Sequence, residues 1–218
     1  MAKAKFSDKL AAAGGAKVDN HFRSANDKQK VRELVLDEIG GAVFDAFAGS
    51  GEMYRRVWHR APGYVGCDLK WFPDDDRLAF VADNRRVLRC IDLSQFGIFD
   101  LDAYGSPWEQ ATIIAARRPV KPGERIGFVL TDGVNMKLKM GDAPRAMAKL
   151  AGLRPRAVGL ASSHDELAYR SIGGLCRQMN CTATRIWRAR GKSAARVLYF
   201  GLIMVGKPLT ERAVRPRT

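Results

Sequence analysis

The sequence predicts an α/β fold with a mostly parallel, doubly wound, seven-stranded sheet and an antiparallel C-terminal hairpin. Two observations predict it. Apolar stretches of strand length alternate with stretches of helical spacing, an order that builds a parallel sheet with helices on both faces. Two β-like segments then follow one another at 182–189 and 197–205, and the Arg-Gly-Lys-Ser turn between them is typical of a hairpin. We expect this hairpin to add one antiparallel strand at the edge of the sheet.

The elements follow in order. Residues 1–26 are rich in Lys, Ala, Gly, Ser and Asn and predict a flexible basic arm ahead of a single domain at 27–218. Apolar residues at helical spacing predict a helix over 27–39 that ends at Gly40-Gly41. We expect further strands from Ala42 and at 63–68, 78–83, 98–102 and 125–132, and further helices at 53–60, 84–91, 108–118 and 144–152.

The last helix is predicted to begin with a capping box. Ser163 and Glu166 have the spacing of that motif, and the helix should run to about Met179. His164 lies in its first turn and is expected at the surface, as are His21 and His59.

The chain is strongly basic. Its 218 residues fit one domain with a sizeable core, and 46% hydrophobic and 28% charged residues predict a globular, soluble protein. A net charge of +14 attracts polyanions, of which nucleic acid is the commonest in a cell. We therefore expect a nucleic-acid partner, although part of this charge can be ordinary solvated surface.

Neither a metal site nor secretion is indicated. The four cysteines form no C-x-x-C pair, and no histidine lies at metal-ligand spacing from them. No apolar run is long enough to span a bilayer, and the N-terminus lacks the apolar core of a secretory signal. The sequence predicts a cytoplasmic protein with no bound metal and no membrane association.

A glycine-rich turn, Asp-Ala-Phe-Ala-Gly-Ser-Gly at 45–51, follows the first strand. Glycine lets the backbone approach a ligand closely, and the next helix offers free amides. The turn is no P-loop, because no Gly-Lys-Ser/Thr follows. Asp68 ends the next strand, 23 residues after Asp45, where an acid can bind ribose hydroxyls. A helix cap or a loop carboxylate is the alternative role for Asp68.

The strand at 98–102 leads into Asp-Ala-Tyr-Gly-Ser-Pro. Gly and Pro force a sharp turn, so Asp102 and Tyr104 should be displayed at the carboxyl edge of the sheet, where open α/β sheets bind ligands. A carboxylate there accepts hydrogen bonds from a base amine, and an aromatic ring offers a stacking face. Asp100 should share the face of Asp102 and either orient the cofactor side or accept backbone amides. Trp108 is either a second stacking surface or a core aromatic.

These motifs together resemble the Rossmann-like S-adenosylmethionine-dependent methyltransferases over about residues 40–206. The motif at 100–107, D-L-D-A-Y-G-S-P, is similar to the D-L-D-P-F-G-S-P of the tRNA guanine N2-dimethyltransferases, and Thr131-Asp132 fits the same pattern. One departure is Ala103, which stands where that group has proline and makes the turn less rigid.

The resemblance implies a transferase with S-adenosyl-L-methionine as cofactor. It implies that the methionine end of the cofactor lies against Asp45, Ala48, Gly49 and Gly51, the ribose against Asp68, and the adenine beside Asp83 and Asn84. The reacting amine would bond to Asp102 and the Ala103 carbonyl, and Tyr104 would stack on an extruded base.

The resemblance implies that the substrate is an exocyclic amine of a nucleic-acid base, and it favours guanine N2 of RNA. Substrate contacts are expected from the turn residues Gly105, Ser106 and Pro107 and from the basic residues Arg188, Arg190 and Lys192 of the hairpin. The alternatives are a DNA adenine N6 methyltransferase of low sequence specificity, a non-catalytic RNA- or DNA-binding module on this fold, and a small-molecule methyltransferase.

Overall fold

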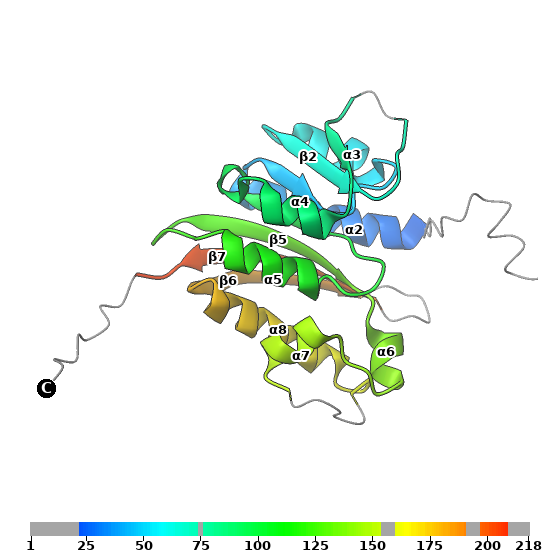
Figure 1. The fold of residues 1–218 in the computed structure, drawn as a ribbon, viewed down its shortest axis with the longest axis vertical. Helices are drawn as coiled ribbons and strands as arrows, with labels where there is room; N and C mark the ends of the chain where they lie inside the picture. The colour runs from blue at the N-terminus through cyan, green and yellow to red at the C-terminus, as the bar shows by residue number, and fades with distance from the viewer. Residues whose placement is uncertain (1–21, 74–75, 154–159, 191–196, 209–218) are drawn as a thin grey trace, which may run out of the picture.

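A seven-stranded sheet forms the centre of the molecule in the computed structural model, which describes residues 22–73, 76–153, 160–190 and 197–208 (Figure 1). The strands are β1 (Val43–Asp45), β2 (Tyr64–Asp68), β3 (Ala79–Val81), β4 (Ile98–Leu101), β5 (Arg125–Asp132), β6 (Cys181–Arg190) and β7 (Leu198–Gly206). Their order in the sheet is β3-β2-β1-β4-β5-β7-β6.

The helices are α2 (Phe22–Ile39), α3 (Glu52–Arg56), α4 (Asn84–Cys90), α5 (Trp108–Arg117), α6 (Asn135–Lys139), α7 (Arg145–Ala151) and α8 (His164–Gln178). Short 3-10 helices lie at Trp58–Arg60 and Leu93–Gln95. None of the helices in the described part of the chain is long and apolar enough to cross a membrane.

Two apolar cores cover the two faces of the sheet. Alternate residues of each buried strand belong to different cores, as the two-residue period of a strand requires. On one face Val43, Ile98, Val129 and Ile203 pack with α2 and Trp58. On the other face Phe44, Phe99, Phe128 and Leu202 pack with α4, α5, α7 and α8. The predicted doubly wound α/β fold is therefore confirmed.

The hairpin was predicted to add one antiparallel strand at the edge, and the structure shows which of its two strands is the edge. Strand β7 runs antiparallel to both β5 and β6 and lies between them, so β6 and not β7 is the edge. The physical reason is burial: residues 198–204 are all buried on both faces, which suits an interior strand. Strand β6 instead exposes Arg185, Arg188 and Arg190, and charged side chains are typical of an edge.

Three local differences concern the helices. Helix α2 begins at Phe22, so residues 22–26, assigned to the arm, are helical, and Ala25 is buried; residues 1–21 lie outside the described residues. The short helix α6 was not predicted. Helix α8 begins as predicted, but the Ser163 side chain makes no capping hydrogen bond, because its backbone lacks the extended conformation that a capping residue needs.

Candidate active site

The carboxyl ends of β1 and β4 bring three acids to one cavity. Asp45 and Asp100 are paired residues of these neighbouring parallel strands, and Asp102 follows directly after β4. They line a cavity of about 210 Å³ together with the glycine turn and the first half of α2. The sequence predicted that Asp45 and Asp102 would share a site, and the structure brings them together.

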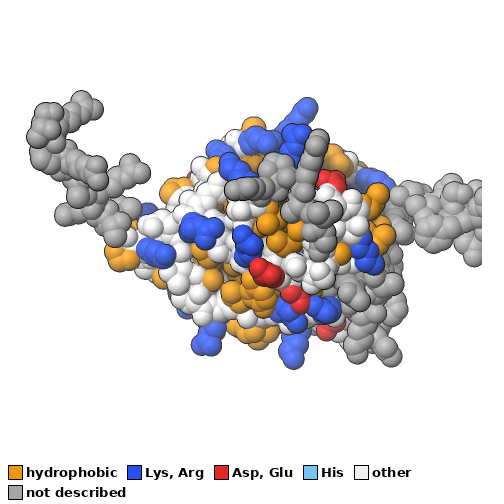
Figure 2. Space-filling model, turned by 90° about the horizontal axis from the view of Figure 1, so that it is seen from below, with side chains coloured by type: hydrophobic (Ala, Val, Ile, Leu, Met, Phe, Trp, Pro, Cys, Tyr) orange, Lys and Arg blue, Asp and Glu red, His pale blue; other side chains and the backbone are white. Residues whose placement is uncertain are grey.

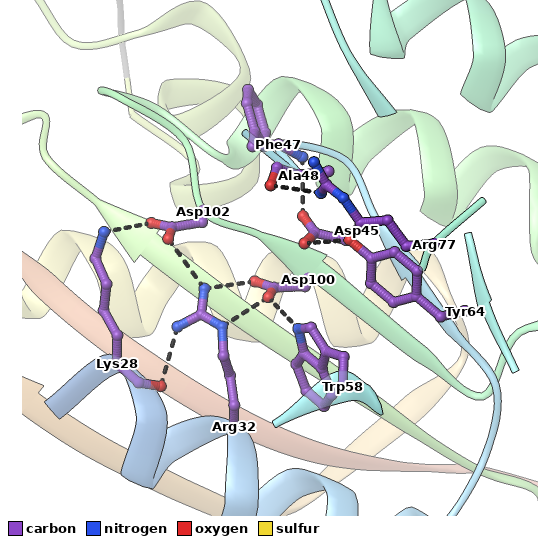
Figure 3. Close-up of polar contacts among 10 residues, drawn as sticks. All are labelled: Lys28, Arg32, Asp45, Phe47, Ala48, Trp58, Tyr64, Arg77, Asp100 and Asp102. Carbon is purple, nitrogen blue, oxygen red and sulfur yellow. Dashed lines mark hydrogen bonds and ion pairs between the residues drawn. The ribbon is translucent and has the colours of Figure 1, made fainter. Parts of the chain in front are cut away.

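A buried arginine from α2 organises these acids (Figure 3). The Arg32 guanidinium is fully buried and donates from Nε and Nη2 to both oxygens of Asp100, at 2.7 and 2.8 Å. Its Nη2 also lies 3.2 Å from Asp102 Oδ2. Trp58 Nε1 donates to Asp100 at 2.8 Å. Asp100 is thus held by side chains rather than by the backbone amides considered from the sequence.

Asp102 is kept as a carboxylate. Burial alone would raise its pKa, but Arg32 and Lys28 outweigh burial and hold the pKa of Asp102 below its usual value. Lys28 Nζ lies 3.1 Å from Asp102 Oδ1. Both side chains keep some solvent access, whereas Arg32 has none. Asp102 is therefore a hydrogen-bond acceptor over the neutral pH range.

The pKa of Asp45 is shifted in the opposite direction from that of Asp102. Burial, and then the charge of Asp100, raise the pKa of Asp45 to about 8. Its carboxyl group accepts hydrogen bonds from the Phe47 amide and from Tyr64 Oη, each at 3.0 Å. Asp45 can therefore gain or lose a proton near neutral pH, and a cation bound in the cavity would favour the ionised form.

The glycine turn is held in a fixed shape. Gly49 and Gly51 have φ angles of 47° and 79°, which favour glycine. Arg77 donates to the carbonyls of Ala48 and Gly49, at 2.9 and 2.5 Å. The Gly49 amide donates to Asp68 Oδ2 at 3.0 Å. The turn therefore keeps its shape through β2 and the segment after it, and Gly51 precedes α3.

A second cavity, of about 240 Å³, adjoins the first at this turn. It shares Ala48, Gly49 and Phe72 with the first and is also lined by Asp68. Asp68 accepts from the amides of Gly49 and Lys70, so it stabilises this loop, and its contact with a ribose stays a prediction. Each of its oxygens retains a second acceptor position.

Asp83 and Asn84 line neither cavity. Asp83 caps α4 by accepting from the Arg85 amide, and hydrogen bonds from Arg85 lower the pKa of Asp83 to about 2. Asn84 donates to the Ala46 carbonyl at 2.7 Å and accepts from Gln110 at 3.0 Å. The structure thus gives both residues structural bonds beside the end of β1.

The turn after β4 displays its aromatic residue. Tyr104 is 78% exposed, whereas Ala103 before it is buried. The Gly105 carbonyl accepts from the Gly133 amide at 2.7 Å, which ties this turn to the end of β5. Ser106 Oγ is buried and has no hydrogen-bond partner among the described residues, and Pro107 caps α5. Trp108 is a core aromatic: it is fully buried, with Nε1 2.8 Å from Asp132 Oδ2.

His164 was predicted at the surface, and this is wrong. It is 5% exposed, and its Nε2 lies 3.3 Å from Asp132 Oδ1 without hydrogen-bond geometry. The cause is tertiary packing, because α8 begins against the buried end of β5. His59 is exposed as predicted, and His21 lies outside the described residues.

Arg188 and Arg190 of the hairpin line neither cavity. Arg188 Nη1 lies 2.9 Å from Asp165 Oδ2, and Arg190 pairs with the same carboxylate. Lys192 lies outside the described residues. In the face seen in Figure 2, Lys and Arg side chains are spread over the surface and few acids lie among them. No group of His, Cys, Asp or Glu that could hold a metal ion occurs in the described ranges.

Sequence reasoning missed Lys28, Arg32 and Arg77. Arg32 carried a signal: it lies between Val31 and Val35 on the apolar face of a predicted helix, where a lone charged residue needs a buried partner. Arg77 gave none, because its bonds to the glycine turn depend on how the segment between β2 and β3 folds back.

No family model and no curated protein matches the sequence. Solved structures do match. Trm1 from Pyrococcus horikoshii, in complex with S-adenosyl-L-methionine, is 16% identical over 87% of this chain, with a TM-score of 0.57. The chain spans 57% of the length of that protein.

Two N-methyltransferases match at a TM-score of 0.51. The 1,6-didemethyltoxoflavin-N1-methyltransferase of Burkholderia thailandensis is 14% identical, and the match covers 92% of this chain and 86% of that chain. NodS of Bradyrhizobium japonicum is 10% identical, and the match covers 87% of this chain and 99% of that chain. The chain therefore has the fold of the class I S-adenosylmethionine-dependent methyltransferases.

Proposed function

We propose that this protein transfers a methyl group from S-adenosyl-L-methionine to an exocyclic amine of a nucleic-acid base, with guanine N2 of RNA as the favoured target. The observation that carries the proposal is the setting of Asp102. It is an ionised acceptor at the carboxyl end of β4, in the cavity beside the glycine turn, two residues before an exposed tyrosine.

The charges that line the cavity complement this cofactor. Asp45, Glu52 and Asp102 line it and would hold the cationic ammonium and sulfonium groups, and Lys28 would hold the carboxylate. The two adjoining cavities together reach the size of cofactor pockets, roughly 300–1,000 Å³, and Asp68 lines the second of them. When bound, S-adenosylmethionine supplies a strongly activated methyl group.

The protein's task is then to hold and orient the amine. A carboxylate has about four acceptor positions, and Lys28 and Arg32 each occupy one at Asp102. Asp102 and the Ala103 carbonyl accept the N–H groups of the amine, which directs its lone pair and stabilises the positive charge that develops on nitrogen.

Lys28 is the partner of Asp102 that is able to move. Arg32 is fixed by its bonds to Asp100 and has no solvent access, whereas Lys28 is partly exposed on a flexible stem. Lys28 would be the residue to turn toward the carboxylate of the cofactor, and that movement would open a further acceptor position at Asp102 Oδ1. Cofactor bound before the base would therefore favour the amine.

A nucleic-acid substrate is favoured over a small molecule by charge and by the turn after β4. The structural neighbours include methyltransferases of different substrates, so fold alone does not select one. The net charge of +14 and the exposed Tyr104 suit a polyanion with a base to stack upon. The D-A-Y-G-S-P sequence favours guanine N2.

The test is transfer of labelled methyl groups. The full chain is incubated with methyl-labelled S-adenosylmethionine and with unmodified tRNA transcripts or duplex DNA, and the digested nucleosides are analysed by mass spectrometry. We expect labelled N2-methylguanosine from RNA. Labelled N6-methyladenine from DNA would establish the alternative target. Binding of both polymers with no labelled nucleoside formed would support a non-catalytic binding module.

A further inference from the structure

Helix α6 and the residue that follows it expose two methionines to solvent. Met136 is 55% and Met140 81% exposed, although burying a methionine side chain stabilises a protein. The helix itself is well anchored. Val134 and Leu138 are buried in the core, and the Val134 amide donates to Asp132 Oδ1 at 3.1 Å. The exposure therefore belongs to a fixed element of the fold.

The exposed residues form a ridge with a lysine on each side. Met140 follows the helix directly, and its amide bonds to the Met136 carbonyl. At about 100° per residue, Met136 and Met140 share one face, Lys137 and Lys139 flank it, and Leu138 points back into the core. Within the described part of the chain, neither lysine forms an ion pair.

This ridge lies beside the candidate active site. Strands β4 and β5 are parallel neighbours, and the loops that follow them are joined by the Gly133–Gly105 hydrogen bond of 2.7 Å. Tyr104 directly precedes Gly105, and α6 begins two residues after Gly133. In Figure 1, α6 lies beyond the carboxyl end of β5.

We propose that Met136 and Met140 form an apolar wedge that packs against the bases next to the target base once that base has left its stack, with Lys137 and Lys139 on the neighbouring phosphates. This inference rests on the proposed function. An extruded base leaves unstacked neighbours whose faces are apolar, and apolar side chains, methionine included, are inserted between bases by other nucleic-acid-binding proteins. The unpaired lysines complement the phosphates.

The experiment separates the apolar from the ionic contribution. Binding of a fluorescein-labelled RNA hairpin is measured over a range of salt concentrations with the full chain and three double variants: Met136→Gln with Met140→Gln, Met136→Leu with Met140→Leu, and Lys137→Gln with Lys139→Gln. Thermal unfolding of each variant checks the fold. All four side chains are exposed, so we expect wild-type stability.

The glutamine substitutions of the methionines should weaken binding about tenfold at every salt concentration, because they remove the apolar contacts with the bases and leave the charge unchanged. The leucine substitutions should stay within about twofold of wild type. The lysine variant should lower the salt slope by about two. A loss below about threefold in the methionine-to-glutamine variant would overturn the wedge.

A matched DNA hairpin and an assay of methyl transfer to the RNA hairpin complete the test. A larger loss on DNA than on RNA would assign the ridge to DNA and overturn RNA as its partner. Ridge-dependent binding in a protein that transfers no methyl group would refute the proposed function and leave the ridge as a nucleic-acid surface.

Discussion

Replacing Arg32 with methionine should strongly destabilise the protein. The guanidinium is fully buried, bonds to both oxygens of Asp100 at 2.7 and 2.8 Å, and contacts Asp102 at 3.2 Å. Removing one partner of a buried ion pair leaves an uncompensated charge and costs about 3–5 kcal/mol. For a domain of this size, about 2–4 °C per kcal/mol corresponds to a midpoint roughly 6–20 °C lower.

The loss should also depend on pH. Burial raises the pKa of Asp100 and Arg32 opposes that rise, so the variant carries a still higher pKa there. A raised folded-state pKa means that stability falls as pH increases from the ordinary carboxyl value, near 3.9. The variant should therefore lose more stability relative to wild type at pH 8 than at pH 5.

Urea unfolding at the two pH values measures both effects. The matched control is Arg125→Met, which removes an exposed arginine paired with Glu38 and should cost less than about 1 kcal/mol. If Arg32→Met lost no more than this control, and equally at pH 5 and pH 8, the buried cluster would not hold this edge of the sheet together.

Three further predictions concern ligands. Gly51→Val places a β-branched residue at φ 79°, which costs about 1–3 kcal/mol of backbone strain. Calorimetry should show that this variant remains folded and no longer binds the cofactor. Unchanged cofactor affinity would remove the turn from the site. Affinity for S-adenosylmethionine should rise with pH through about 8, because ionised Asp45 attracts the cationic cofactor. S-adenosylhomocysteine, without the sulfonium charge, should respond less, and a pH-independent affinity would exclude Asp45 from the site. Tyr104→Ala should weaken RNA binding by about 1–3 kcal/mol and leave cofactor affinity unchanged; gel-shift titration would contradict stacking if affinity stayed the same.

The sequence predicts an element well where its apolar residues are continuous or follow a helical period. Strands β4 and β5 carry continuous apolar residues, and their positions were predicted to within a residue. Helix α6 was not predicted, because its five residues, with Met136 and two lysines exposed, show no apolar period. The order of β6 and β7 was also not predicted, because a hairpin signal does not show which of the two strands pairs with the rest of the sheet.

The site was predictable at the strand ends and not beyond them. Asp45 and Asp102 lie at the ends of strands that are neighbours in this topology, so their meeting follows from the fold class. Lys28 and Arg32 come from a helix about 70 residues earlier in the chain, and no local pattern links them to Asp102. His164 shows the same limit, because its burial depends on the distant Asp132.

Single-turnover methyl transfer by Asp102→Ala tests whether Asp102 holds the reacting amine. The rate is measured with labelled S-adenosylmethionine on the nucleic acid that wild type methylates, and cofactor affinity is measured by calorimetry on the same preparation. We predict a rate about 100-fold or more below wild type with nearly unchanged cofactor affinity, because the bonds of Asp102 to the amine matter most in the transition state. A near-normal rate in this variant would show that Asp102 does not hold the amine.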